Sequence, residues 1–257
     1  MSRFANLEFG QEPEGAPRRH SSGRDEQRCL EDAQTAFEQA DFEAALRAFS
    51  KVLEFNPHNI AAWAGQVRAL VELGEFNEAK LWADKALERF ADAPELLASK
   101  AVALARLGDT DAAIAFSDAA VEAQGDTPYV WLARGDVLLA RAEKRADYCF
   151  DKALALAPGD WFVAWLAARV RAFYRQFALA LKLVQQALAL KPDHTVLWLM
   201  AGQCQQALGL VSAARNSYGQ VLQLDPRRLE ARDALNELGN SGLSSRIGAW
   251  WRRISER

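Results

Sequence analysis

Apolar residues recur along the chain every three to four positions, which is the spacing of one face of an α-helix. The apolar runs come in pairs, and a short polar turn, such as the segment from Glu72 to Ala79 or that from Arg106 to Ala113, separates the two members of a pair. This pattern predicts a succession of helical hairpins. We therefore expect an almost wholly helical fold of about thirteen helices, without a β-sheet.

The hairpins follow one another with a fixed period. One row of small residues has steps of 34 residues with a single step of 33 after its third member: Ala45, Ala79, Ala113, Ala146, Ala180 and Ala214. A second row has the same period and the same short step: Val52, Ala86, Ala120, Ala153, Ala187 and Val221. Independent rows that share one period and one defect indicate a true internal repeat.

Small residues, glycines and prolines indicate how each hairpin closes. Gly74, Gly108 and Gly209 stand where the first helix must end, a position that often requires a positive φ. The alanines of the first row allow the second helix to approach the first closely. Prolines, which cannot continue a helix, follow the second helix in four repeats: Pro57, Pro158, Pro192 and Pro226. Because one hairpin cannot bury its own apolar face, the repeats must stack on one another.

The last repeat resembles a tetratricopeptide repeat, because Trp198, Gly202, Gly209, Ala214, Tyr218 and Pro226 have the spacing of that family. The resemblance implies an all-α fold, a right-handed α-solenoid of about six hairpins plus a C-terminal capping helix. The repeats cover residues 26–59, 60–93, 94–127, 128–160, 161–194 and 195–228. The fourth repeat departs from the pattern, since its turn is one residue short and lacks glycine. In the fifth, Arg175 stands at the glycine position.

Composition changes along the chain and predicts three segments. Residues 1–24 are rich in glycine, proline and serine, which is typical of a disordered segment. Residues 25–239 form the predicted solenoid, and its last helix, within residues 227–239, has the polar outer face that the end of a solenoid requires. Residues 240–257 form a predicted short, basic, amphipathic C-terminal helix.

Composition and motifs give no support to catalysis. The formal net charge is −3, which argues against a nucleic-acid partner. The three cysteines lie far apart and fit a reducing compartment, and no apolar stretch has the length of a signal peptide or a membrane span. The three histidines lie in the predicted disordered segment or in turns. We therefore predict a cytoplasmic protein that is not an enzyme and has no catalytic residues, metal site or cofactor.

The family resemblance also implies a binding surface, because the first helix of each repeat lines a concave groove in this family. It assigns these groove residues in the last three repeats: Tyr129, Leu132, Asp136, Phe162, Trp165, Arg169, Phe173, Leu199, Gln203 and Gln206. In the second and third repeats Arg68 and Arg106 take such positions. The aromatic residues either fill space between helices or form a patch for a partner. Aromatic rings beside an arginine favour the patch.

One branch of the family holds a C-terminal carboxylate with lysines, asparagines and an arginine. The corresponding positions here include Leu30, Gln34, Gly65, Glu95 and Ser99, so that carboxylate clamp is missing. An apolar peptide, either helical or extended, suits this groove better.

The C-terminal tail combines apolar and basic residues. On a helical wheel Leu243, Ile247, Trp250, Trp251 and Ile254 fall within an arc of roughly 100°, and the tail carries four arginines and one glutamate. Something must cover two tryptophans on one face. We expect Ile247, Trp250, Trp251 and Ile254 to dock on the closing helix, while an anionic membrane surface and a partner protein are the alternatives.

Taken together, the sequence predicts a non-catalytic scaffold or adaptor that binds a peptide or protein partner in the concave groove. Two alternatives stay open. One is a membrane-associated assembly factor that makes peripheral membrane contact through the tail. The other is a self-assembling scaffold, in which the tail or the head of one copy binds the groove of another.

Overall fold

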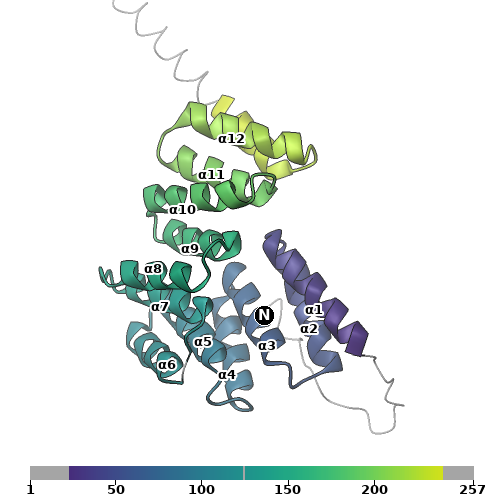
Figure 1. Ribbon diagram of the computed structural model, residues 1–257, viewed down its shortest axis with the longest axis vertical. Helices are drawn as coiled ribbons and strands as arrows, with labels where there is room; N and C mark the ends of the chain where they lie inside the picture. Colours follow the sequence, from purple (N-terminus) through teal and green to yellow (C-terminus); the bar gives the residue numbers. More distant parts are fainter. Residues whose placement is uncertain (1–22, 124, 240–257) are drawn as a thin grey trace, which may run out of the picture. The chain divides into compact units, whose positions relative to one another are not determined.

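The protein is described by a computed structural model over residues 23–123 and 125–239, and within these residues it consists of helices and connecting turns (Figure 1). The helices are α1 (Gly23–Glu38), α2 (Phe42–Phe55), α3 (Ile60–Glu72), α4 (Phe76–Leu87), α5 (Pro94–Leu107), α6 (Thr110–Glu122), α7 (Pro128–Ala140), α8 (Ala146–Leu156), α9 (Trp161–Phe173), α10 (Phe177–Leu190), α11 (Thr195–Ala207) and α12 (Val211–Leu224). One further helix, the closing helix, covers residues 229–239. The described residues thus confirm the prediction of an all-α repeat fold with thirteen helices and no strand.

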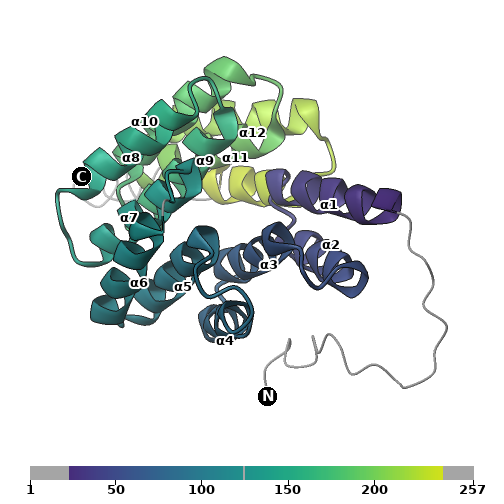
Figure 2. The ribbon, with the colours of Figure 1, turned by 60° about the horizontal axis from the view of Figure 1, so that its bottom comes forward.

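The hairpins fall into two compact units. Unit 1, residues 1–158, contains α1 to α8, and unit 2, residues 159–257, contains α9 to α12 and the closing helix. In unit 1 the first helices α3, α5 and α7 follow one another side by side, with α4 packed against α5 and α6 against α7 (Figure 2). In unit 2 α10 packs against both α9 and α11, and α12 packs against α11. Each unit therefore has the stacked-hairpin arrangement that the period predicts.

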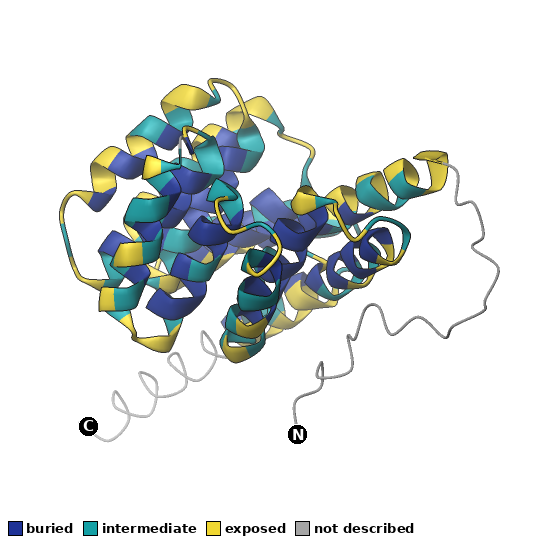
Figure 3. Cartoon of the chain, turned by 90° about the horizontal axis from the view of Figure 1, so that it is seen from below, coloured by how far each residue is buried: buried dark blue, intermediate teal, exposed yellow. Residues whose placement is uncertain are grey.

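The two rows of small residues lie where helices meet. Every member of both rows is at most 1 % exposed to solvent. Complete burial of alanine is the expected result when two helix backbones approach closely, since a larger side chain would not fit between them. Buried residues face neighbouring helices and exposed ones lie on the outside and in the turns (Figure 3). The small residues thus set the spacing of the hairpins.

A left-handed residue closes the first helix in all six hairpins. At the predicted glycines φ is 79° at Gly74, 88° at Gly108 and 75° at Gly209, which confirms the expected positive values. The equivalent residues of the other three hairpins, Ala40, Ala142 and Arg175, also have a positive φ of 55–60°. Because a side chain in this region costs roughly 1–2 kcal/mol, the packing of the hairpin, and not the local preference of the residue, determines these three turns.

The second helices end where the prolines predict. Helices α2, α8, α10 and α12 all stop two residues before a proline of the repeat. In α6 the start is also fixed, because the side chain of Asp109 accepts a hydrogen bond from the backbone N–H of Ala112 at 3.3 Å. Such a cap satisfies one of the N–H groups left without a partner at a helix start.

Glycines in two helices allow aromatic rings to pack against the backbone. A Cβ atom at Gly202 in α11 would lie 2.5 Å from the ring of Tyr218 in α12, and one at Gly135 in α7 would lie 2.8 Å from the ring of Phe150 in α8. Neither contact leaves room for a side chain. The ring of Tyr218 is 1 % exposed, and its hydroxyl donates a hydrogen bond of 2.7 Å to Oε1 of Gln206.

Two predicted segments fall largely outside the described residues. These are the head, of which only Gly23 and Arg24 are described, as the start of α1, and the tail at residues 240–257. Among the helices of the described part of the chain, none combines the length and the hydropathy that crossing a bilayer requires.

Candidate functional site

Arg68 occupies the centre of the inner face of unit 1, the face formed by the first helices of its hairpins. It projects from α3, and its guanidinium carbon lies 4.1 Å from the ring centroid of Tyr129 in α7 and 5.2 Å from that of Phe37 in α1. Cation–π contacts of this kind hold an arginine in place without neutralising its charge. Within residues 23–123 and 125–239, no carboxylate lies within ion-pair distance of Arg68. The structure thus brings together three side chains from three separate repeats.

A chain of hydrogen bonds fixes the orientation of Tyr129. Its hydroxyl lies 3.1 Å from Oγ of Ser99 in α5, and Oγ of Ser99 donates to the backbone carbonyl of Glu95 at 2.7 Å. Burial raises the pKa of Tyr129 to about 12, although the charge of Arg68 acts in the opposite direction. The ring is therefore a neutral phenol at physiological pH, and it presents one face to Arg68.

A second arginine of this face is neutralised. Arg106 in α5 forms a two-point ion pair with Asp136 in α7, with Nε–Oδ1 at 3.1 Å and Nη2–Oδ2 at 2.6 Å. Both side chains are nearly excluded from solvent, at 8 % and 3 % exposed. Such a geometry braces two neighbouring repeats. Asp136, predicted as a groove residue, is therefore a bracing residue of the inner face.

The predicted aromatic group of α9, in unit 2, is only partly exposed. The ring of Trp165 packs against that of Phe162 at a centroid distance of 5.5 Å, and the guanidinium of Arg169 lies 5.2 Å from the Trp165 centroid. Trp165 is fully buried, whereas Phe173 is 49 % exposed. This burial corrects the expectation that Trp165 presents its ring on an open wall, since packing against its neighbours leaves no surface for a partner.

The remaining predicted groove residues also divide by exposure. Leu132 and Leu199 are buried, so they contribute to packing between helices. Gln203 is exposed, while Gln206 accepts the hydrogen bond of Tyr218. The four tail residues Ile247, Trp250, Trp251 and Ile254 lie outside the described residues, and their docking stays a prediction.

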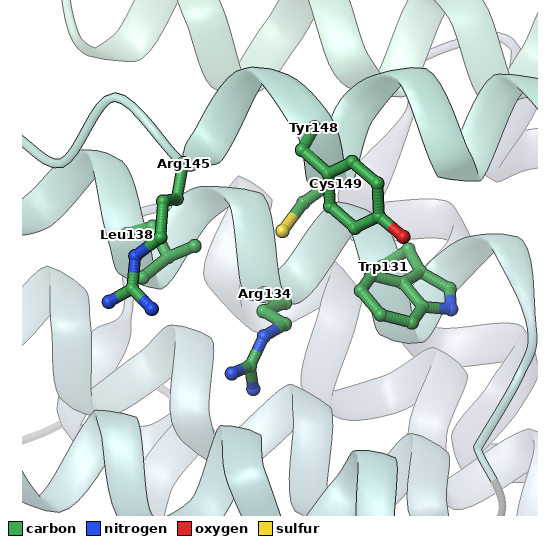
Figure 4. A pocket seen from close by; sticks show the side chains of 6 residues that line it. All are labelled: Trp131, Arg134, Leu138, Arg145, Tyr148 and Cys149. Carbon is green, nitrogen blue, oxygen red and sulfur yellow. The ribbon is translucent and has the colours of Figure 1, made fainter.

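Sequence reasoning missed a surface pocket in unit 1. It has a volume of about 340 Å³ and lies between α7 and the start of α8 (Figure 4). Six residues line it: Trp131, Arg134, Leu138, Arg145, Tyr148 and Cys149. The indole of Trp131 meets the 63 % exposed ring of Tyr148 edge to face at 6.1 Å. The short turn of the fourth repeat was the available signal, because it supplies Arg145 at the mouth of the pocket.

The two arginines of this pocket already have carboxylate partners. Nη1 of Arg134 contacts Oδ1 of Asp118 at 2.7 Å, and Nη2 of Arg145 contacts Oε2 of Glu143 at 2.5 Å. Burial raises the pKa of the Cys149 thiol, so this sulfur is not a thiolate at neutral pH. The pocket can therefore receive an apolar or aromatic group, but it offers no activated nucleophile.

Comparisons with known proteins identify the repeats. Two tetratricopeptide repeat families match residues 36–101 and 94–127. No curated protein sequence matches the chain. Among solved structures, the chain is similar to TTC0263, a thermophilic tetratricopeptide repeat protein of Thermus thermophilus, with 18 % identity over 83 % of this chain and 98 % of the other, at a TM-score of 0.51.

Two further solved structures have the same fold. PilW, a type IV pilus biogenesis factor, is 19 % identical over 82 % of this chain and 98 % of its own, with a TM-score of 0.51. A tetratricopeptide repeat protein from Parabacteroides merdae ATCC 43184 is 14 % identical over 86 % and 88 %, with a TM-score of 0.50. At these identities the likeness establishes the fold of the described residues alone.

Proposed function

We infer that this chain, which belongs to the tetratricopeptide repeat family, is a non-catalytic scaffold that binds a segment of a partner protein on the inner face of unit 1. The family is generally one of protein-interaction modules. Burial raises the pKa of the Cys204 thiol to about 11 and that of Cys149 above its usual range, so neither cysteine is an activated nucleophile. Recognition of a partner is the activity that such a surface supports best.

The observation that carries this proposal is the contrast between two arginines of one face. Asp136 neutralises Arg106, whereas two aromatic rings hold Arg68 and leave its positive charge available. A preorganised cation loses little conformational freedom when it binds an anion, so it contributes more affinity than a mobile surface arginine. A partner segment that places an aspartate or glutamate side chain against Arg68 fits this chemistry. An apolar side chain beside the acid would contact Tyr129, which is partly exposed, whereas Phe37 is 3 % exposed and only holds Arg68 in place.

The experiment has two steps. Affinity purification of the full chain from its native cells, followed by mass spectrometry, identifies candidate partners. Direct binding of a captured protein is then measured for the wild type, for Arg68→Glu and for Arg47→Glu. Arg47 is the matched control, because it lies on α2, is 70 % exposed and contacts only Glu43 of its own helix among the described ion pairs.

We expect Arg68→Glu to weaken binding at least about tenfold, which corresponds to about 1.4 kcal/mol, and Arg47→Glu to leave the affinity within about twofold. Arg47→Glu should melt like the wild type, whereas Arg68→Glu should melt a few degrees lower because it removes two cation–π contacts between helices; binding is therefore compared at a temperature at which circular dichroism shows both variants folded. Equal affinities for the two variants would place the partner on another surface.

A further inference from the structure

Unit 2 has an exposed apolar edge, which we define as Phe173, Leu208, Leu210 and Val211. These residues lie in the turns between α9 and α10 and between α11 and α12, and each is 40–49 % exposed. Phe173 is the last residue of α9, and Val211 is the first of α12. The turns of two consecutive hairpins thus place apolar side chains on the same edge of unit 2.

At two of these four repeat positions unit 1 carries charge, whereas at the other two it also has apolar residues, Leu107 at the place of Leu208 and Phe76 at that of Val211. Glu72 and Arg106 stand where Phe173 stands in unit 2, and Asp109 takes the place of Leu210. Asp109 caps α6 with its side chain, whereas Leu210 stands at the start of α12 and makes no side-chain cap. Leucine is among the poorest residues at this position in water. Several other helices of the chain also start without a side-chain cap, but at Leu210 an exposed apolar residue takes the place of a polar one, which makes this edge a candidate docking surface.

The last described residue lies beside this edge. Helices α11, α12 and the closing helix are joined by turns of three or four residues and share one core, which includes Leu199, Tyr218 and Leu238. Helices joined so closely run antiparallel, so the closing helix ends, at residue 239, on the same edge as the C-terminus of α11. The tail therefore starts from the apolar edge, and only the short polar sequence Asn240–Ser241–Gly242 precedes its first apolar residue.

We propose that residues 243–257 bind intramolecularly to the apolar edge through Ile247, Trp250, Trp251 and Ile254. As a helix these fifteen residues would be about 22 Å long, and neighbouring packed helices lie about 8–10 Å apart. A segment of this length spans both hairpins of unit 2. The exposed Glu237, in the last turn of the closing helix, lies where it can meet the arginines of the tail.

This proposal differs from the prediction made from the sequence, in which the tail docks against the closing helix, whose outer face was predicted to be polar. That face is polar, with Arg232, Asp233, Asn236 and Glu237 exposed. Apart from Leu229 at the far end of this helix, which is 62 % exposed, it has no exposed large apolar residue, whereas the edge has four that are 40–49 % exposed. The assignment involves unit 2 alone and is independent of the partner-binding role of Arg68.

Trypsin cleavage of the full chain tests the proposal, because Arg246, Arg252 and Arg253 are cleavage sites within the tail. Leu208→Asp is compared with Leu107→Asp, which changes the same repeat position in unit 1 at 39 % instead of 40 % exposure. We expect Leu208→Asp to accelerate cleavage of the tail about tenfold and Leu107→Asp to leave it unchanged. Equal rates in the wild type and both variants would overturn the proposal.

A second measurement asks whether Leu210→Asp raises or lowers Tm, in the chain with an intact tail and in a chain without the two tail tryptophans. Leu210→Asp supplies the missing cap of α12, so it should raise Tm by about 4 °C when the edge faces water. We expect this rise in the full chain carrying Trp250→Ala and Trp251→Ala, and a loss or no gain in the chain with an intact tail. The same rise in both backgrounds contradicts a covered edge.

The two alternatives to intramolecular docking, in which a second copy covers the edge or the tail binds a membrane, give different results. If the mass in solution grows with concentration and Leu208→Asp reverses that growth, the edge binds a neighbouring copy. If the tail is protected from trypsin only when vesicles of anionic lipid are added, the tail binds a membrane. Either result replaces the intramolecular proposal.

Discussion

Units 1 and 2 have the same repeat and both have apolar cores between their helices, but the polar contacts around these cores differ. In unit 1 ion pairs connect separate helices, as between Lys100 and Asp84 at 2.6 Å and between Arg134 and Asp118 at 2.7 Å. In unit 2 the described core of the last hairpin and the closing helix is apolar, with Tyr218 at its centre. The repeat therefore fixes the backbone, while the residues between the repeated positions decide whether a surface is charged or apolar.

The same difference extends to the turns. Unit 1 carries charged residues such as Glu72 and Asp109 on the edge where unit 2 carries Phe173 and Leu210. A charged edge stays in water, whereas neighbouring exposed apolar residues mark a surface that another segment or protein can cover. Unit 1 is accordingly suited to present a charged inner face to a partner, and unit 2 to bind a segment of its own chain. Four predictions test this difference between the units.

The largest effect is expected at Trp165 in unit 2. Trp165→Ala should lower the free energy of unfolding by about 3–5 kcal/mol, because it leaves a cavity in place of a fully buried ring. Urea denaturation followed by circular dichroism measures this loss. Trp165→Phe is the control, and it should cost less because the indole N–H makes no hydrogen bond among the described residues. If the Trp165→Ala protein melted like the wild type, Trp165 would not contribute to the core, and the original prediction that it belongs to the partner-binding surface would stand.

The next effect concerns the buried ion pair of unit 1. Asp136→Ala should destabilise the protein by about 3 kcal/mol, at the lower end for such pairs because Arg106 keeps some access to water. The double variant Arg106→Met/Asp136→Leu removes both charges and should recover most of that loss. Thermal melts of the single and double variants give the comparison. Equal losses in the two variants would mean that the pair itself, and not an unpaired charge, supplies the stability.

The fold could be predicted because the repeat constrains it at many positions. The alanine rows predicted the helix contacts, and Gly74, Gly108 and Gly209 predicted the left-handed turns. The repeat position determines the backbone conformation even where the residue type disfavours it. Arg175, for example, adopts a φ of 60° because its place in the hairpin requires a left-handed residue. Boundaries of the repeats were predictable for the same reason.

The candidate site could be predicted only in part. The repeat position of Arg68 indicated the inner face, but no sequence pattern indicated that Asp136 would neutralise Arg106 and leave Arg68 to two aromatic rings. Trp165 was placed on the groove by its repeat position, yet exposure depends on the sizes of the neighbouring side chains. Ion pairs, cation–π contacts and burial of this kind depend on which side chains of neighbouring repeats meet, and the repeat period does not specify those side chains.

A smaller effect should be the same in both units, because it concerns the shared backbone. Ala180→Leu in unit 2 and Ala79→Leu in unit 1 each insert a larger side chain at a fully buried helix contact. We expect each to lower the free energy of unfolding by roughly 1–3 kcal/mol through overpacking. Chemical denaturation of the two variants provides the test. A marked loss in one unit and none in the other would show that the hairpins are not equivalent.

The smallest effect bears on the turns. Asp41 caps α2 of unit 1 by accepting a hydrogen bond from the backbone N–H of Ala44 at 3.0 Å, and Leu210 stands at the equivalent place in unit 2. Asp41→Leu therefore copies the turn of unit 2 into unit 1 and should lower the free energy of unfolding by about 1 kcal/mol. Glu75→Ala is the control, since Glu75 precedes α4 without a side-chain cap and its loss should change stability by less than about 0.5 kcal/mol. Thermal melts of both variants measure the difference. If Asp41→Leu lost nothing, a leucine at this position would need no covering group, and the contrast between the two edges would no longer support a docked tail.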